Sequence, residues 1–380
     1  MRKEPGEKEL PASSRDVSLD LLKGIGCLLM ILAHSKVLVP DSGFMIYIGG
    51  FAPIFFFSVS GIAGYIQSHK YAPSKIFILY SILLLLGFSY NGISHPHFLV
   101  DIDFDILQMI AFGTLVAYFI ERFLKPNIWI YGFLIIIPFG VKVIFLDLLQ
   151  QNNIPWVSGI FLPPGLFAIF PWLFLFFGGL FAYKVENRFN LLAAFFLSVI
   201  YLILSYFKYP LDPQNKWDMS LGYFLLCNII LFLMFYVVRK FPYFQIEKGK
   251  SLILYWGRNS LLFLFVHIAL IEILRNFKRL YYVRFILEYP LLVWILLLFL
   301  ATSVMWLVVR ALKHEALFGF FSLLHVWVIL AVGIFLAAWY VENESTLFIV
   351  HLSIGILTGL YFPVLAVNFK KNNVKHLTSM

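Results

Sequence analysis

Residues 17–38 of the chain read VSLDLLKGIGCLLMILAHSKVL. This run is long enough to cross a bilayer as one α-helix, because about 20 apolar residues span the hydrocarbon core. It nevertheless contains the ionisable side chains of Asp20, Lys23 and His34. Ionisable side chains are expensive to bury inside a membrane, so their presence predicts that they have partners or a function.

Lys23 and His34 are eleven residues apart in this run. At about 100° per residue, that separation is roughly 1100°, which is close to three full turns of an α-helix. Their Cα atoms then lie roughly 16 Å apart along the axis, about half the hydrocarbon thickness. The spacing therefore predicts a helix face with a cation near its beginning and a titratable base near its end.

The rest of the chain is equally apolar. Of its 380 residues, 61% are hydrophobic and 13% are charged, and the mean hydropathy is +0.88, which leaves too little polar surface for a water-soluble globule. The apolar runs are continuous, whereas a membrane β-barrel alternates in segments of about ten residues. We therefore expect an all-α, polytopic transmembrane helix bundle of about 10–12 spans. The candidate runs are 17–38, 44–68, 74–92, 103–121, 127–148, 165–183, 189–207, 219–238, 251–274, 288–312, 318–340 and 346–368.

The predicted organisation is one membrane domain with two short tails. Residues 1–16 are polar and predict a disordered cytoplasmic tail, residues 17–368 form the single transmembrane domain, and residues 369–380 form a second cytoplasmic tail. The first run is longer than the apolar part of a signal peptide and lacks a cleavage site, so we expect it to remain as a helix. The short loops leave no room for a large soluble domain, so any chemistry lies inside the bundle or at its mouths.

The distribution of Lys and Arg predicts the orientation. Basic residues before the first span favour a cytoplasmic amino terminus, and most later loops then follow the positive-inside rule. One loop is an exception, because it is basic although the alternation of spans places it on the outer side of the membrane. It contains Arg275, Lys278, Arg279 and Arg284. The formal charge of +9 is explained by orientation and by anionic membrane lipids as partners, without nucleic acid. We expect a multi-pass protein of the cell (inner) membrane.

Few sequence motifs for known chemistry are present. The chain has no His-Glu-x-x-His spacing, and we expect no metal site. It also lacks a P-loop, a Rossmann glycine pattern and a Gly-x-Ser-x-Gly elbow, so nucleotide hydrolysis is not indicated. The chemistry must come from polar residues within the spans.

Several short motifs, in chain order, resemble integral-membrane acyltransferases. The first combines a basic residue, ten residues and a His, as in acyltransferase family 3, although that family usually has Arg in place of Lys23. Two others resemble the heparan-α-glucosaminide N-acetyltransferase branch. In that branch Asn stands at the position of His34 and a catalytic His follows in the outer loop; this chain has no His between Ser35 and Gly50, which favours His34. The motifs are Ser18–Ile25 with Met30–His34, Pro53–Gly61, Phe104–Ile110, Phe170–Gly179, and Gly257–Leu261 leading to His267.

The resemblance implies transfer of an acyl group, acetyl by default, from cytoplasmic acyl-CoA (acetyl-CoA) to a hydroxyl or amine of a sugar or cell-envelope glycan at the outer face. Polysaccharide O-acetylation is one such reaction. A neutral imidazole can act as general base or carry the acyl group itself, and the sequence leaves both roles open. The implied catalytic residues are His34 and His267. The implied donor-binding residues are Lys23 and Arg258, since phosphates need cations. We also expect substrate to be bound by Asp20, His95, His97, Gln108, Trp172 and Asn259.

Other interpretations stay open at this stage. Asp20 and Lys23, at i and i+3, could simply neutralise one another, and His34 or His267 could be a hydrogen-bonding strut between helices. His95 and His97 could belong to an ordinary solvated loop. The main alternative function is a secondary transporter or exporter of a small molecule or glycan precursor, although the two halves show no convincing repeat. A non-catalytic lipid or glycan scaffold is a third alternative.

Overall fold

The computed structural model describes residues 16–38, 43–94, 103–152, 159–163, 165–240, 251–277, 288–312, 314–341 and 343–371. Nearly all of both predicted tails, and the candidates His95 and His97, lie outside these residues. Within them the regular structure is helical and contains no strand, so the predicted all-α class is confirmed.

Nine candidate spans among the described residues are long and apolar enough to cross a membrane. They are α1 (Val17–His34), α2 (Gly43–Gly49) together with α3 (Ala52–Lys70), α4 (Pro73–Ser94), α5 (Ile106–Phe119) with the π-helix η2 (Ile120–Leu124), α6 (Ile128–Asn152), α9 (Asn187–Tyr206), α10 (Leu221–Lys240), α14 (Pro290–Leu312) and α17 (Glu344–Lys371).

The remaining three predicted runs form helices that are bent or short. Two runs are bent pairs, α11 (Leu252–Arg258) with α12 (Ser260–Phe277) at 98°, and α15 (Glu315–Phe321) with α16 (Leu324–Tyr340) at 77°. The third, α8 (Ile169–Lys184), has only 16 residues. Each of the twelve predicted runs therefore contains a helix, but hydropathy did not reveal which runs are interrupted.

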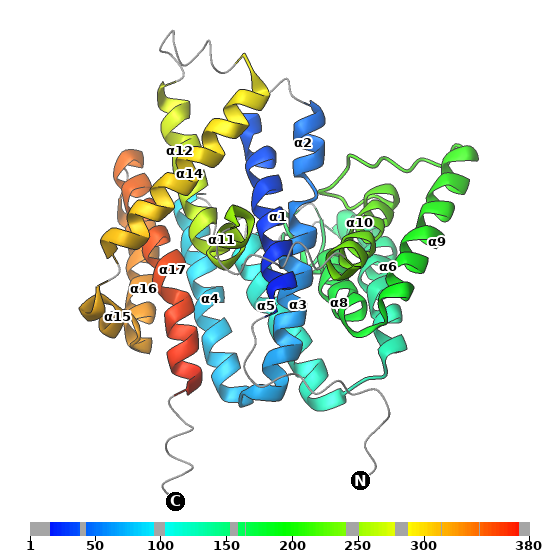
Figure 1. Ribbon diagram of the computed structural model, residues 1–380, viewed down its shortest axis with the longest axis horizontal. Helices are drawn as coiled ribbons and strands as arrows, with labels where there is room; N and C mark the ends of the chain where they lie inside the picture. Colours follow the sequence, from blue (N-terminus) through cyan, green and yellow to red (C-terminus); the bar gives the residue numbers. More distant parts are fainter. Residues whose placement is uncertain are drawn as a thin grey trace, which may run out of the picture.

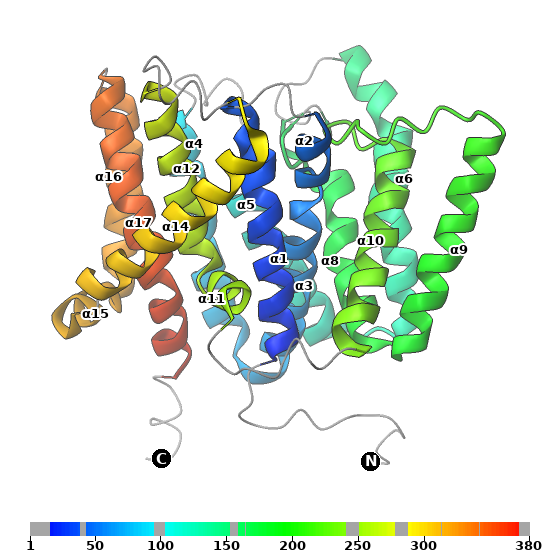
Figure 2. The same cartoon turned by 45° about the horizontal axis from the view of Figure 1, so that its top comes forward.

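The helix α1 lies in the middle of the bundle (Figure 1). Helices α6, α8, α9 and α10 gather on one side of it, and α14 to α17 gather on the other (Figure 2). The first residues of α1 and the last residues of α17 lie at the same, lower end in Figure 2. α1, α3 and α5 are largely buried, whereas α6 and α9 expose most of their apolar side chains, as expected for helices that face lipid.

Small residues let α1 approach its neighbours closely. A Cβ atom on Gly257 of α11 would lie 1.8 Å from the Asp20 carbonyl oxygen, and one on Gly24 would lie 2.1 Å from the Ile253 carbonyl oxygen. Neither contact tolerates a side chain, so the two glycines allow the backbones of α1 and α11 to touch, as is common between membrane helices. This contact brings Arg258 to the beginning of α1.

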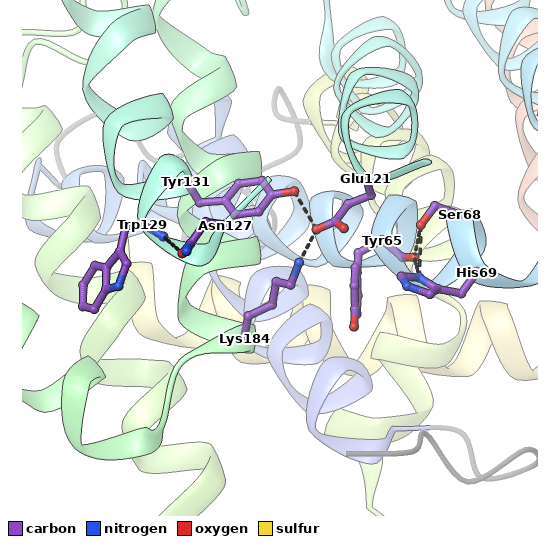
Figure 3. A network of polar contacts seen from close by, with 8 residues as sticks. All are labelled: Tyr65, Ser68, His69, Glu121, Asn127, Trp129, Tyr131 and Lys184. Atoms are coloured by element: carbon purple, nitrogen blue, oxygen red, sulfur yellow. Dashed lines mark hydrogen bonds and ion pairs between the residues drawn. The ribbon is translucent and has the colours of Figure 1, made fainter. Parts of the chain in front are cut away.

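A buried polar cluster joins α3, η2, α6 and α8 (Figure 3). The Glu121 carboxylate Oε1 accepts hydrogen bonds from the Tyr131 hydroxyl and the Lys184 ammonium, both at 2.5 Å. The Lys184 ammonium also lies 4.6 Å from the centre of the Tyr65 ring. Because the one buried carboxylate is matched by a cation and a hydroxyl, this cluster fixes the ends of several helices relative to one another.

Candidate active site

Two histidines from distant parts of the sequence meet where α1 ends. His34 Nδ1 lies 2.9 Å from His267 Nε2 on α12, and the two rings stack with their centroids 5.0 Å apart. His267 is completely buried, whereas His34 is only partly buried. The pair is built by packing, since 233 residues separate its members.

Hydrogen bonding determines where the protons of the neutral pair lie. His267 Nδ1 lies 2.8 Å from the Phe263 carbonyl oxygen, which can only accept, so His267 carries its proton on Nδ1. With both rings neutral, His267 Nε2 is then an acceptor, and His34 must donate from Nδ1. His34 Nε2 therefore carries a lone pair for which the described residues provide no donor, and this is the form that a general base or nucleophile needs.

His34 lines a cavity of about 270 Å³, which we call the His34 cavity. Its wall also includes Asp105 at the beginning of α5, Phe167, and the neighbours Lys216 and Trp217 in the loop between α9 and α10. The Lys216 ammonium lies 4.2 Å from the centre of the Trp217 ring and 5.2 Å from that of Phe167. The cavity thus places a base, a carboxylate, a cation and an aromatic surface together.

The ammonium of Lys216 is less basic than that of an ordinary lysine. Burial, together with the smaller effect of the nearby Lys36, lowers the pKa of Lys216 to about 8, although Cys227 and Asp105 oppose the shift. Lys216 therefore remains mostly protonated at pH 7, and it loses its charge within a pH range in which activity can be measured.

A second cavity, of about 360 Å³, contains Lys23 and is called the Lys23 cavity. Its polar wall includes Ser60, Gln67, Tyr80 and Ser260, the first residue of α12. Gln67 donates through Nε2 to the Tyr80 hydroxyl at 3.0 Å, while its buried Oε1 has no hydrogen-bond partner among the described residues.

The two cavities adjoin one another. Both are lined by the same four apolar side chains, Met30, Phe56, Ile106 and Leu264. Lys23 and His34 thus face adjacent cavities rather than one continuous cavity. Met30 is unbranched and flexible, so a change of its rotamer could join the two cavities without moving a helix.

Asp20 stands between two cations where α1 begins. Its Oδ1 lies 3.2 Å from the Lys23 ammonium, and its Oδ2 lies 3.5 Å from Nε of Arg258. The neutralising pair considered from the sequence is therefore present. Lys23 nevertheless also lines a cavity, so it can serve both the ion pair and a ligand. Asn259 occupies the bend between α11 and α12, where its Nδ2 donates to the Tyr255 carbonyl oxygen at 2.9 Å.

Two other candidates line neither cavity. Gln108 is fully buried against Gly87, and its two amide atoms have no hydrogen-bond partner in the part of the chain that the structure describes. Trp172 is also fully buried and packs edge-to-face against Phe57 and Phe167. These positions indicate roles behind the cavity wall rather than direct contact with a ligand.

Sequence reasoning missed Lys216, Trp217 and Gln67. One signal for Lys216 was available, because it lies in a loop that the alternation of spans places outside, where the positive-inside rule predicts few lysines. Gln67 and Trp217 had no distinguishing local pattern. Within the described ranges, no group of three or more His, Cys, Asp or Glu side chains is arranged to hold a metal ion.

Residues 15–198 match the family model described as heparan-alpha-glucosaminide N-acetyltransferase, catalytic. The match covers just under half of the chain, including Asp20, Lys23 and His34 but neither His267 nor Lys216. It supports the heparan-α-glucosaminide branch of the resemblance and is not specific to acyltransferase family 3. No curated protein and no solved structure matches the chain. The protein therefore combines a region similar to an acetyltransferase catalytic domain with the helices of a multi-pass membrane protein.

Proposed function

We propose that the protein is a membrane acetyltransferase that moves an acetyl group from acetyl-CoA, entering through the Lys23 cavity, to a hydroxyl or amine of an envelope glycan in the His34 cavity. The observation that carries this proposal is the His34–His267 pair, in which His34 lines the His34 cavity and has its Nε2 lone pair available. The similarity of residues 15–198 to an acetyltransferase favours this activity over transport.

His34 acts as the base of the transfer. Its Nε2 removes the proton from the acceptor while the acceptor oxygen or nitrogen attacks the thioester carbonyl. The new C–O or C–N bond forms, the C–S bond breaks, and the proton on His34 passes to the sulfur of the departing CoA. During the step His34 is an imidazolium whose Nδ1–H donates a charge-assisted hydrogen bond to His267, so His267 holds the ring in position and stabilises its charge.

The donor is held by the residues at the beginning of α1. Lys23 and Arg258 supply positive charge for the CoA phosphates, and Asp20 fixes the two cations in place. Ser60 and Gln67 supply polar atoms along the Lys23 cavity for the amides of the pantetheine arm. With the amino terminus in the cytoplasm, the Lys23 cavity takes its donor from the cytoplasmic side and the His34 cavity takes its acceptor from the external side. The host membrane is then the cell membrane.

The test is acetyl transfer by the purified full-length protein in detergent. Radiolabelled acetyl-CoA and an envelope glycan extract are supplied to the wild type, to His34→Ala, and to His325→Ala as a matched control, because His325 is exposed on α16. We expect His34→Ala to lose about 10²–10⁴-fold in kcat, the range for a general base, and His325→Ala to retain wild-type activity. Equal turnover by His34→Ala would remove His34 from the mechanism. Absence of CoA release with every glycan fraction would refute the enzyme assignment.

A covalent route is separated from direct transfer by the same reagents. If His34 itself carries the acetyl group, label from acetyl-CoA remains on the protein when acceptor is omitted, and CoA is released in a burst. Direct transfer instead releases CoA only when both substrates are present.

A further inference from the structure

A third cavity, of about 790 Å³, lies between α11 and α14 and is larger than either cavity of the proposed active site. We call it the α11–α14 groove. Its wall on α14 extends from Leu298 to Leu307, which is roughly 14 Å along the helix axis. None of its lining residues falls within residues 15–198, so the match to the acetyltransferase model assigns the groove no role.

The groove is open to the membrane. Phe299, Trp306 and Leu307 line it, and each is more than half exposed. They belong to α14, a candidate span most of whose residues are not buried, so the exposed side faces lipid hydrocarbon. Its volume is that of a small-molecule site. A long apolar groove of this size that faces hydrocarbon fits an acyl chain.

The groove lies in the half of the bundle where α1 begins. One wall is α11, which contacts the beginning of α1 through Gly257 and Asp20. The other wall is the later part of α14, which crosses the bundle obliquely toward the same end (Figure 2). With the amino terminus in the cytoplasm, the groove therefore faces the cytoplasmic leaflet, whose surface is negatively charged by anionic lipids.

Polar and charged groups accompany the apolar wall. Ser251 of α11 and Ser303 of α14 line the groove from its two sides, and the Ser251 side chain makes no capping hydrogen bond to its helix. Their hydroxyls can donate to the ester carbonyls of a lipid. Arg310 follows the groove on α14. It is exposed, and its guanidinium lies 5.2 Å from the centre of the Trp306 ring, so a positive charge stands beside the groove wall.

The groove also covers a joint between three helices. Trp256 of α11 donates through Nε1 to the Thr302 hydroxyl of α14 at 2.9 Å, and both residues line the groove. The Trp256 carbonyl oxygen accepts from the Cys27 thiol of α1 at 3.8 Å. A molecule in the groove therefore packs on the contact that joins α14 to α11 and α11 to α1, and a ligand that binds only the folded protein stabilises it.

We propose that the α11–α14 groove binds one phospholipid with an anionic headgroup: an acyl chain lies along α14 between Leu298 and Leu307, and the headgroup phosphate binds Arg310. A zwitterionic phospholipid offers the same chains but carries a cation that Arg310 repels, so it binds more weakly. This site is separate from the proposed acetyl transfer, because its walls include neither His34 nor Lys23.

The experiment measures lipid binding to the full-length protein in detergent by native mass spectrometry. The protein is titrated with phosphatidylglycerol or with phosphatidylcholine of the same acyl chains. The variants are Arg310→Met, which removes the cation, and Ser303→Trp, which fills the groove. Arg188→Met is the matched control, because Arg188 on α9 is also exposed and lies 5.3 Å from the centre of an aromatic ring, that of Phe189.

We expect the wild type to hold one phosphatidylglycerol more tightly than phosphatidylcholine, and its unfolding midpoint to rise when phosphatidylglycerol is added. Arg310→Met weakens phosphatidylglycerol binding about fivefold, the effect of one basic residue near a charged membrane surface, and leaves phosphatidylcholine binding little changed. Ser303→Trp removes the tight site for both lipids. Arg188→Met binds both lipids as the wild type does.

The contradicting outcomes are distinct. Equal affinity of the wild type for the two lipids, or equal phosphatidylglycerol binding by the wild type and Arg310→Met, overturns the proposal. A dimer in detergent that Ser303→Trp converts to a monomer identifies the groove as an interface between two copies of the chain, which also overturns it. Arg310→Met leaves the groove wall intact, so its result decides the proposal even if Ser303→Trp does not fold. CoA release is not measured, so failure here leaves the proposed function standing.

Discussion

The bundle contains two polar clusters that differ in how completely their hydrogen-bonding groups are paired. In the cluster of Glu121, Tyr131 and Lys184, hydroxyl and ammonium converge on the same carboxylate oxygen, and the positive and negative charges match. In the His34 cavity, His34 uses one ring nitrogen for His267 and keeps the other, and Lys216 is met by aromatic rings. In the first cluster the charged and polar groups are paired with one another, and these pairs stabilise the fold. The second leaves bonding capacity that a substrate can use.

The largest expected effect is a loss of activity without a loss of stability. His34→Gln should lower kcat by about 10²–10⁴-fold because it removes the base, while the thermal unfolding midpoint stays near that of the wild type. The measurement pairs initial rates with thermal denaturation in the same detergent. A large fall in the midpoint would mean that His34 is mainly a structural strut.

Lys184→Met should show the opposite behaviour. It leaves the Glu121 carboxylate buried without its cation, which costs about 3–5 kcal/mol when one partner of a buried pair is removed. We therefore expect a clear fall in the unfolding midpoint and near-normal specific activity of the folded fraction. The double variant Glu121→Gln with Lys184→Met should recover part of the loss, and additive losses would argue against coupling between the two residues.

His267→Phe should have an intermediate effect on rate. The variant removes the acceptor for His34 Nδ1–H, so the ring loses its fixed tautomer and orientation, and we expect kcat to fall about 10- to 100-fold. His267→Gln keeps an acceptor oxygen and should lose less. Because His267 acts through His34, the KM for acetyl-CoA should not change in either variant. A changed KM with unchanged kcat would place His267 in substrate binding instead.

The smallest effect is a pH dependence of acceptor binding. Lys216, with its pKa lowered to about 8 by burial, is charged below that pH and neutral above it. The groups around it are Lys36, Asp105, Cys227 and His34. The KM for a glycan acceptor that contacts the Lys216 ammonium should rise about threefold between pH 7.5 and pH 8.5, as the charged fraction of Lys216 falls. Lys216→Arg should remove this dependence, because Arg stays protonated throughout that range. An unchanged pH profile in Lys216→Arg would assign the titration to another group.

The sequence predicted more of the fold than of the site. Hydropathy located all twelve apolar runs, because a chain in lipid must satisfy its backbone hydrogen bonds within each segment, and this makes a span a local property. Helix periodicity likewise placed Lys23 and His34 on one face of α1. Hydropathy did not predict the 98° bend at Asn259, because a short interruption scarcely alters the mean over a long window.

Tertiary contacts, which no local sequence pattern contains, decided which of the candidate site residues line the cavities. Lys23 and His34 line adjoining cavities, and Arg258 joins Asp20 at the beginning of α1. Gln108 and Trp172, which the motifs placed beside substrate, are packed behind the cavity wall.

By itself the sequence determined a helical membrane protein and the register of α1, since both depend on residues close together along the chain. The tertiary structure decided that His267 contacts His34, 233 residues away along the chain, and that Lys216 lines the same cavity as His34. These contacts between distant residues depend on which helix faces pack together. Here glycine contacts such as that of Gly257 with Asp20 set that packing, by allowing one backbone to approach another.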